Sequence, residues 1–271
     1  MINTIIKRII IGAVAVSIPV GGSIFYFANN SGNQEPGKKE QIVDIFDDKD
    51  KDKDKDKDKK DDNVKHPGTD AKISNPHKEN IQNKIEEYNN SEVVGVLTIP
   101  GTSINTVVVQ HNDNEYYLEH NANLEEDVAG AVYLDYRVEI NSGRKNIIYG
   151  HNGDSELLNV PFTELENYYD EEFYKNHKYV YLEDKDGVGT YEIFSVFVET
   201  RDPNYMYLNF KNDSSWKEHI NYLKNKSLYA TYVEVDETDD VLILQTCSHS
   251  EEYSKYKDRY LLVVAKRVNY E

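Results

Sequence analysis

Short runs of β-forming residues, separated by turn-forming residues, fill the chain from about Ser74 to the C-terminus. Runs of this length that are rich in Val, Ile, Thr and Tyr are typical of strands, and breaks such as Pro100-Gly101 are typical of turns. The pattern predicts eight strands, which are Val93–Ile99, Ile104–Gln110, Ala131–Leu134, Asn146–Tyr149, Tyr191–Val198, Thr231–Val235, Val241–Thr246 and Tyr260–Val264.

Three stretches change to the spacing of an amphipathic helix. One begins at Asn75-Pro76, where proline suits the first helical position, and extends to Asn89. The others are Pro161–Tyr169 and Asp213–Lys226, and in the latter Trp216 and Ile220 fall on one face. Many short strands with a few helices between them predict a mainly β fold, a closed or nearly closed mixed β-barrel with inserted helices.

The N-terminus predicts a membrane anchor. Lys7 and Arg8 precede an apolar run of 20 residues, 9–28, which as a helix would be about 30 Å long and could cross a bilayer. The positive-inside rule places residues 1–8 in the cytoplasm and the rest of the chain outside the cell. A cleaved signal peptide is the alternative, although its apolar region is usually shorter.

Residues 29–73 predict an extracellular tether. From Asp47 to Asp62 the sequence contains only Asp and Lys, so it has no apolar side chain to bury and is expected to stay disordered. The spaced aspartates lack the glycine and glutamate of a calcium-binding EF-hand loop. We therefore interpret this stretch as a solvated tether, and residues 74–271 as one globular domain.

Charge and cysteine content exclude several functions. The 49 acidic residues against 31 basic ones give a formal charge of −18, which is unsuited to gripping nucleic acid because phosphate binding depends on Lys and Arg. The chain has one cysteine, so it can form neither an intramolecular disulfide nor a zinc site built on several cysteines. Nothing in the sequence indicates a metal or a cofactor.

The single cysteine, Cys247, ends the most apolar strand, where the chain turns into a polar loop. A buried structural thiol or an intermolecular disulfide is one interpretation. The position also suits a catalytic group, because such groups are often presented on loops at strand ends. A catalytic thiol needs a base or a positive charge nearby, since the thiolate is the nucleophile.

Two histidines could supply that base. His151 follows the apolar strand Asn146–Tyr149 through Gly150 and so ends a strand, as Cys247 does. His249 is two residues from the thiol, and on an extended chain these two side chains share a face. The remaining histidines of the domain lie among polar residues and are expected to be solvated, in particular His111, His120, His177 and His219.

Arg259 leads directly into the last predicted strand, Tyr260–Val264. At a strand end it could simply be a solvated charge. Next to a thiol and an imidazole it could instead donate to a developing oxyanion as a fixed positive charge.

These motifs together resemble the sortase family of cysteine transpeptidases on Gram-positive surfaces. The resemblance rests on Tyr149-Gly150-His151-Asn152, then Leu244-Gln245-Thr246-Cys247, then Asp258-Arg259, in that order along a chain with an anchor and a tether. It extends from about Lys78 to the C-terminus. Ile243 stands where the family usually has threonine, a mild departure within the strand.

Two further features resemble class B of the family. These are the N-terminal helix at 76–89 and a long helix-bearing loop, 199–229, between the sixth and seventh strands. The resemblance implies an eight-stranded mixed β-barrel, no cofactor and no metal. It also implies that surface proteins with a C-terminal sorting motif are one partner, and that an amine of a peptidoglycan precursor or cross-bridge is the other.

The resemblance also implies residue roles. Cys247 would attack the carbonyl after a threonine in the sorting motif, with His151 as general acid and later as base, and Arg259 at the oxyanion. Residues flanking this trio would line the peptide groove, with ordinary strand packing as the alternative for each, namely Tyr149, Asn152, Gln245 and Thr246.

Other functions fit the residues less well. Papain-like hydrolases place the cysteine before the histidine, whereas His151 precedes Cys247 by 96 residues. A thiol peroxidase would rest on the cysteine alone. A membrane-tethered adhesin or binding domain with a structural cysteine is the non-enzymatic alternative, and it predicts an unreactive thiol.

Overall fold

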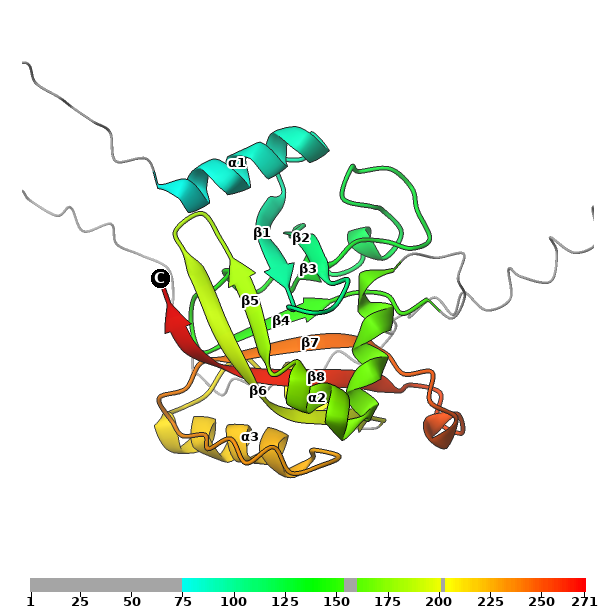
Figure 1. Cartoon of the computed structure of the whole chain (residues 1–271), viewed down its shortest axis with the longest axis vertical. Coiled ribbons are helices and arrows are strands. Elements are labelled where there is room, and N and C mark those ends of the chain that lie inside the picture. The colour runs from blue at the N-terminus through cyan, green and yellow to red at the C-terminus, as the bar shows by residue number, and fades with distance from the viewer. Residues whose placement is uncertain (1–74, 154–159, 201–202) are drawn as a thin grey trace, which may run out of the picture. The chain divides into compact units, whose positions relative to one another are not determined.

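The computed structural model describes residues 75–153, 160–200 and 203–271 (Figure 1). The expected cytoplasmic tail, membrane anchor and tether, residues 1–73, lie outside the described residues, so these assignments stay predictions. In the part of the chain that is described, no helix has both the length and the apolar character needed to cross a membrane.

Eight strands close into a barrel with the order β1-β2-β3-β4-β7-β8-β6-β5. The β2–β3 and β4–β7 pairs are parallel and the other pairs are antiparallel, and β1 closes the barrel by pairing with both β2 and β5. Closure leaves no open sheet edge. The strands are β1 (Val93–Thr98), β2 (Asn105–Val109), β3 (Tyr133–Leu134), β4 (Lys145–Tyr149), β5 (Tyr179–Glu183), β6 (Val188–Glu199), β7 (Val241–Cys247) and β8 (Tyr260–Tyr270).

The expected mixed barrel is confirmed, but one predicted strand is wrong and one strand was missed. Thr231–Val235 forms no strand: the Thr231 hydroxyl donates to the Phe194 carbonyl at 2.7 Å, and Tyr232 has a left-handed backbone with φ +59°. β-forming residues there lack a neighbouring strand to pair with. β5 was missed, although Val180 and Leu182 alternate with more exposed residues as in a half-buried strand.

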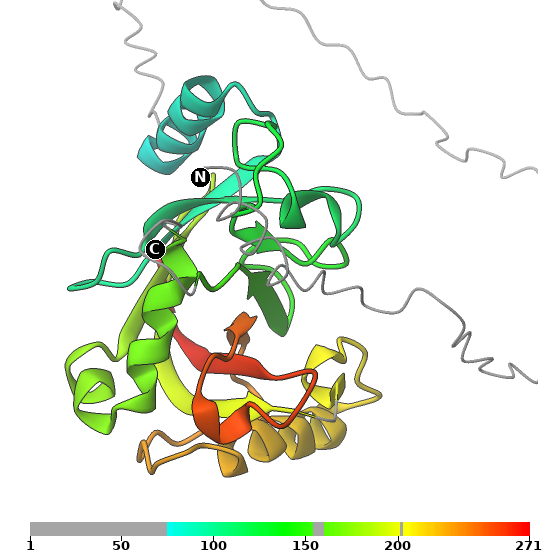
Figure 2. The same ribbon diagram turned by 90° about the vertical axis from the view of Figure 1, so that its right-hand side faces the viewer.

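Three α-helices and four 3-10 helices join the described strands. The expected helix at 213–226 is confirmed and ends one residue earlier, the first expected helix also ends one residue earlier, and the stretch 161–169 is a 3-10 helix. The helices are α1 (Pro76–Tyr88), η2 (Tyr116–Leu118), η3 (Pro161–Tyr169), α2 (Glu171–Asn176), η4 (Pro203–Met206), α3 (Asp213–Asn225) and η5 (Glu251–Tyr253). Helices α1 and α3 lie at opposite ends of this domain (Figures 1 and 2).

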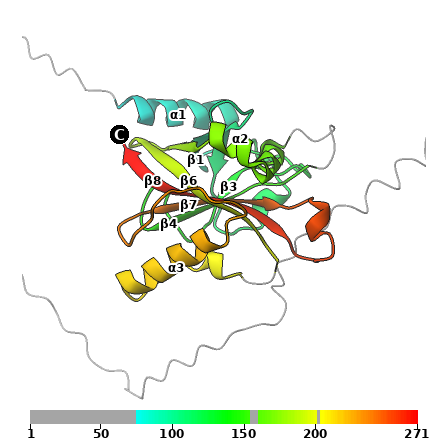
Figure 3. The same ribbon diagram turned by 60° about the horizontal axis from the view of Figure 1, so that its bottom comes forward.

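The central strands are buried on both faces. Along β4, Ile148 belongs to an inner cluster to which all eight strands contribute, whereas its neighbour Ile147 belongs to a second cluster with Trp216 of α3. On β7, Leu244 and Ile243 divide between the two clusters in the same way. Helix α3 therefore covers the outer face of these strands (Figure 3), and this double burial explains why they are apolar without alternation.

Trp216 is the largest fully buried side chain of the outer cluster. Its side chain is fully buried, and its indole Nε1 donates to the Asp239 carbonyl at 3.0 Å. We expect Trp216→Ala to lower the free energy of unfolding by about 3–5 kcal/mol, because it opens a large cavity. Tyr232→Ala is the matched aromatic control, at a side chain that is 88% exposed, and should change it by less than about 0.5 kcal/mol. Equal effects in urea denaturation would contradict this packing.

Candidate active site

The parallel pairing of β4 with β7 places His151 and Cys247 at the same end of the barrel. Tyr149 is the register partner of Gln245, and the Gly150 amide donates to the Gln245 carbonyl at 3.1 Å. His151 and Cys247 each follow two residues after that pair. Residues separated by 96 positions in sequence are thus brought to neighbouring strand ends.

Two further hydrogen bonds tie these strand ends together. The Asn152 amide Nδ2 donates to the Cys247 carbonyl at 2.8 Å, and the Thr246 hydroxyl donates to the Gly150 carbonyl, also at 2.8 Å. One bond runs from the β4 side and the other from the β7 side. The relative position of His151 and Cys247 is therefore fixed by backbone and side-chain bonds on both strands.

Cys247 is a free thiol at the end of β7, opposite Tyr260 of β8. Burial raises the pKa of the thiol above its ordinary value, and the positive charge of Arg259 acts in the opposite direction. Burial disfavours the charged form of any group, and a nearby cation favours a thiolate. The half-buried thiol is thus accompanied by a cation that favours its ionised form.

Arg259 is held by the connection between β7 and β8. Its Nε donates to the Ser248 carbonyl at 2.8 Å and its Nη1 donates to the Tyr256 carbonyl at 2.9 Å. The Ser248 amide in turn donates to the Arg259 carbonyl at 3.0 Å. These bonds fix the guanidinium next to the residue that follows Cys247.

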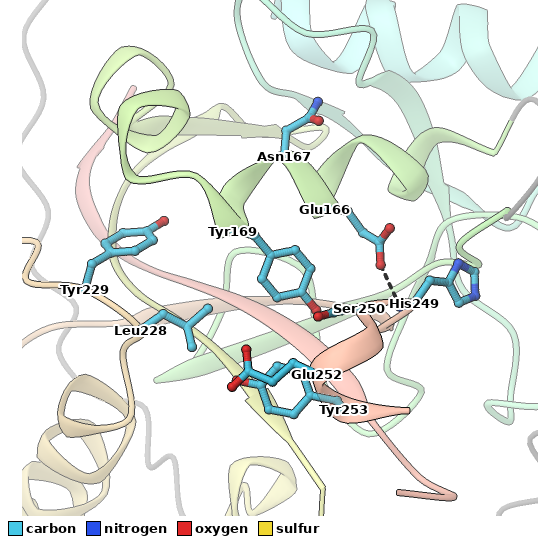
Figure 4. Close-up of a pocket in the computed structure, with 9 residues that line it drawn as sticks. All are labelled: Glu166, Asn167, Tyr169, Leu228, Tyr229, His249, Ser250, Glu252 and Tyr253. Atoms are coloured by element: carbon cyan, nitrogen blue, oxygen red, sulfur yellow. Dashed lines mark hydrogen bonds between the residues drawn. The ribbon is translucent and has the colours of Figure 1, made fainter. Parts of the chain in front are cut away.

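The two candidate bases differ in their surroundings. The Nε2 atom of His151 lies 2.8 Å from the Leu118 carbonyl of η2. His249 instead lines a groove of about 550 Å³ between η3 and η5, and its backbone amide donates to the Glu166 carboxylate at 2.6 Å (Figure 4). The described residues that line this groove include none of the trio His151, Cys247 and Arg259.

The residues that flank the trio make mostly internal contacts. Tyr149 is buried and its hydroxyl donates to Asp135 at 2.8 Å, and Thr246 is buried as well. Gln245 is half-buried, and its Oε1 accepts a hydrogen bond of 2.8 Å from the Tyr205 hydroxyl of η4. These side chains belong to the last residues of β4 and β7, just before the strand ends that carry His151 and Cys247.

A buried lysine that the sequence pattern missed fastens η4 to the barrel. Lys145 of β4 donates from Nζ to the Tyr205 carbonyl at 2.7 Å and to Nε2 of His219 in α3 at 2.9 Å. Burial lowers the pKa of Lys145 to about 7 and that of His219 to about 3. The expectation that His219 is solvated is wrong, because α3 packs its ring against Lys145 of β4 and against the ring of Phe210.

The described residues contain no group of three or more His, Cys, Asp or Glu side chains arranged to hold a metal ion. The thiol of Cys247, the imidazole of His151 and the guanidinium of Arg259 offer a nucleophile, a group that can carry a proton, and a fixed positive charge.

Comparisons with known proteins give one consistent family. A family model for the sortase domain matches residues 97–268. Sortase B of Staphylococcus aureus is 31% identical over 198 residues, covering 72% of this chain and 78% of that protein. Sortase B of Listeria monocytogenes is 34% identical over 169 residues, covering 61% and 67%. The structure of Clostridium perfringens sortase B is similar with a TM-score of 0.61 and 26% identity, covering 69% of this chain and all of that one.

The charge of Arg259 predicts how fast the thiol reacts. Arg259→Gln removes the charge that lowers the pKa of the Cys247 thiol, so a smaller fraction is ionised at neutral pH. We expect alkylation of Cys247 by iodoacetamide at pH 7.5 to slow by roughly tenfold. Lys257→Gln removes a charge from the same connection at an exposed position and should leave the rate nearly unchanged. Equal rates in both variants would refute a specific effect of Arg259.

The buried Lys145 predicts how stability depends on pH. Its folded-state pKa of about 7 lies below the ordinary lysine value of about 10.4, so between these values the unfolded chain binds more protons than the folded chain. The contribution of Lys145 to stability therefore rises as pH increases from about 7 toward 10. In Lys145→Met this rise is lost, and the free energy of unfolding from urea denaturation should gain roughly 1 kcal/mol less per pH unit than in wild type. Parallel curves would show that Lys145 does not titrate in this range.

Proposed function

This chain belongs to the sortase family, and we propose that it is a membrane-anchored enzyme that transfers surface proteins to an amine of the cell wall. The resemblance to the family and to its class B is confirmed by the relatives, which are sortase B proteins. Family membership makes the chain a cysteine transpeptidase. The residue roles, the substrates and the location of the enzyme are what we propose in addition.

The observation that carries the proposal is the placement of a single thiol beside a cation and at the strand end next to His151. Cys247 is the only cysteine of the chain, its thiol pKa responds to Arg259, and the Asn152 amide joins its backbone to the His151 loop. A transpeptidase needs a nucleophile that is acylated and then released, a group that transfers protons, and a positive charge that stabilises the oxyanion.

In the acylation step, Cys247 Sγ attacks the carbonyl carbon after threonine in a C-terminal sorting motif. The thiol proton passes to His151 as the C–S bond forms and the carbonyl becomes a tetrahedral oxyanion. The resulting imidazolium gives that proton to the leaving nitrogen as the C–N bond breaks. Arg259 stabilises the oxyanion. A guanidinium carries five N–H donors, and the bonds of Arg259 to the Ser248 and Tyr256 carbonyls use two of them.

In the second step an amine resolves the thioester. The amine nitrogen attacks the acyl carbon, His151 accepts the proton, a new amide bond forms, and Cys247 leaves as the thiolate. We propose that this amine belongs to a peptidoglycan precursor or cross-bridge. The reaction then conserves one amide bond and needs no external energy source, which suits a site outside the cell.

The N-terminal sequence supports a position at the membrane. The apolar run 9–28 suits an anchor with residues 1–8 in the cytoplasm, and the polar segment 29–73 suits a tether to the catalytic domain. Enzyme and substrate that are both held at one surface meet at a raised effective concentration. A high affinity for the sorting motif is then unnecessary.

Acyl-enzyme formation tests the proposed function. The full chain in mild detergent is incubated with a library of sorting-motif peptides, with and without an amine acceptor, and its intact mass is measured. We expect an adduct that maps to Cys247, disappears in Cys247→Ala and is resolved faster by added amine. His151→Ala should slow its formation by about 10²–10⁴-fold, whereas His249→Ala should form it at nearly the wild-type rate.

Two outcomes would contradict the proposed function or the proposed role of His151. Absence of an adduct across the library, with a Cys247 thiol that is also inert to alkylation, would indicate a tethered binding domain with a structural cysteine. A stronger loss in His249→Ala than in His151→Ala would assign the base to the other histidine.

A further inference from the structure

The imidazole of His151 is hydrogen-bonded to a backbone carbonyl. Its Nε2 lies 2.8 Å from the Leu118 oxygen, and a carbonyl oxygen can only accept a hydrogen bond. Nε2 must therefore carry a hydrogen in this arrangement. In the neutral ring Nδ1 is then the basic nitrogen, and it is the atom through which His151 would give and take a proton.

Gly130 packs closely against the His151 ring and the carbonyls of η2. Its backbone is left-handed, with φ +60°, and a Cβ added there would lie 2.5 Å from the Tyr117 oxygen and 2.9 Å from Cδ2 of His151. The Leu118 oxygen would be 3.1 Å away. Cδ2 is the ring atom bonded to Nε2. A methyl group at position 130 would therefore occupy the space in which the His151 ring approaches the Leu118 carbonyl.

The carbonyls of η2 are themselves held in place. The Ala131 amide donates to the Tyr117 carbonyl at 3.0 Å. The buried Tyr117 side chain donates through its hydroxyl to Glu92 at 2.6 Å and accepts from Asn90 at 2.9 Å. Because η2 is fixed to the barrel in this way, it cannot move aside freely to admit a larger residue at position 130.

We propose that Gly130 is a positioning residue of the transpeptidase: its missing side chain lets the Leu118 carbonyl close on His151 and fixes the imidazole as the Nε2–H tautomer. The inference rests on the proposed function, since the orientation of the ring matters for catalysis only if His151 transfers a proton. During acylation the proton on Nδ1 of the imidazolium passes to the leaving nitrogen, and the Nε2–H bond to Leu118 persists.

A purely conformational role for Gly130 is the alternative, and the chain offers a matched control for it. Gly143 has nearly the same backbone, with φ +65°, but a Cβ added there meets nothing within 4 Å. Gly130→Ala and Gly143→Ala therefore carry the same penalty for a side chain at positive φ. Only the first pushes against His151 and the η2 carbonyls.

The kinetic test compares these two variants of the full chain in mild detergent. We expect Gly130→Ala to lower kcat for transpeptidation by roughly 10–100-fold with KM within about twofold of wild type, because a catalytic group is displaced. Gly143→Ala should keep wild-type kcat. Gly130→Ala should melt at a lower temperature than Gly143→Ala, because its Cβ meets the fixed Tyr117 carbonyl, so kcat is measured at a temperature at which circular dichroism shows both variants to be folded. Equal kcat values in the two variants would overturn the proposal.

A tautomer measurement does not depend on activity, and its decisive result comes from the wild-type chain. Long-range ¹H–¹⁵N correlation spectra of histidine-labelled full chain at pH about 9 report which ring nitrogen is protonated, and comparison with His151→Gln assigns the signal. We expect the Nε2–H tautomer in wild type and a mixture in Gly130→Ala. An Nδ1–H tautomer in wild type would overturn the inference even if the acyl-enzyme forms. Failure of the proposed function would instead appear as the absence of a Cys247 acyl-enzyme in wild type.

Discussion

The in-register parallel pairing of β4 with β7 is the constraint on which the site depends. Parallel strands run in the same direction, so β4 and β7 both end at the same end of the barrel. The register pair Tyr149–Gln245 places the residues that follow each strand side by side. A slip of one residue would turn either His151 or Cys247 to the opposite face. Two side-chain hydrogen bonds that exist only in this register oppose such a slip: Asn152 donates to the Cys247 carbonyl, and Thr246 donates to the Gly150 carbonyl. The register in turn places the thiol and the imidazole at neighbouring strand ends.

Burial and a nearby positive charge act in opposite directions on the pKa of the Cys247 thiol. Burial raises the pKa of the Cys247 thiol and Arg259 lowers it, so one side chain offsets a cost that the fold imposes. Arg259 can do this because the Ser248 and Tyr256 carbonyls hold it. A second basic side chain, the buried Lys145, donates to the Tyr205 carbonyl, and the Tyr205 hydroxyl donates to Gln245 two residues before the thiol. Backbone carbonyls thus accept hydrogen bonds from both Arg259 and Lys145.

Much of this arrangement could be predicted from the sequence, for identifiable reasons. Cys247 and His151 each follow a continuous apolar run, and such runs are strands whose ends are readable. The false strand at Thr231–Val235 and the missed β5 show the limit, because β-propensity does not say whether a partner strand is present. The burial of His219 depends on a loop closing over Lys145, which is a tertiary event. The contact between Leu118 and His151 involves a backbone carbonyl, which every residue has, so no residue pattern could have indicated it.

The central claim is that the register of β4 and β7 makes His151, and not His249, the partner of the Cys247 thiol. A short bifunctional alkylating agent, 1,3-dibromoacetone, tests it directly, because it first modifies a reactive thiol and then bridges only to a nucleophilic nitrogen within a few ångströms. Peptide mapping of the modified full chain by mass spectrometry identifies the bridged pair. The account predicts a bridge between Cys247 and His151. A bridge between Cys247 and His249 would contradict it.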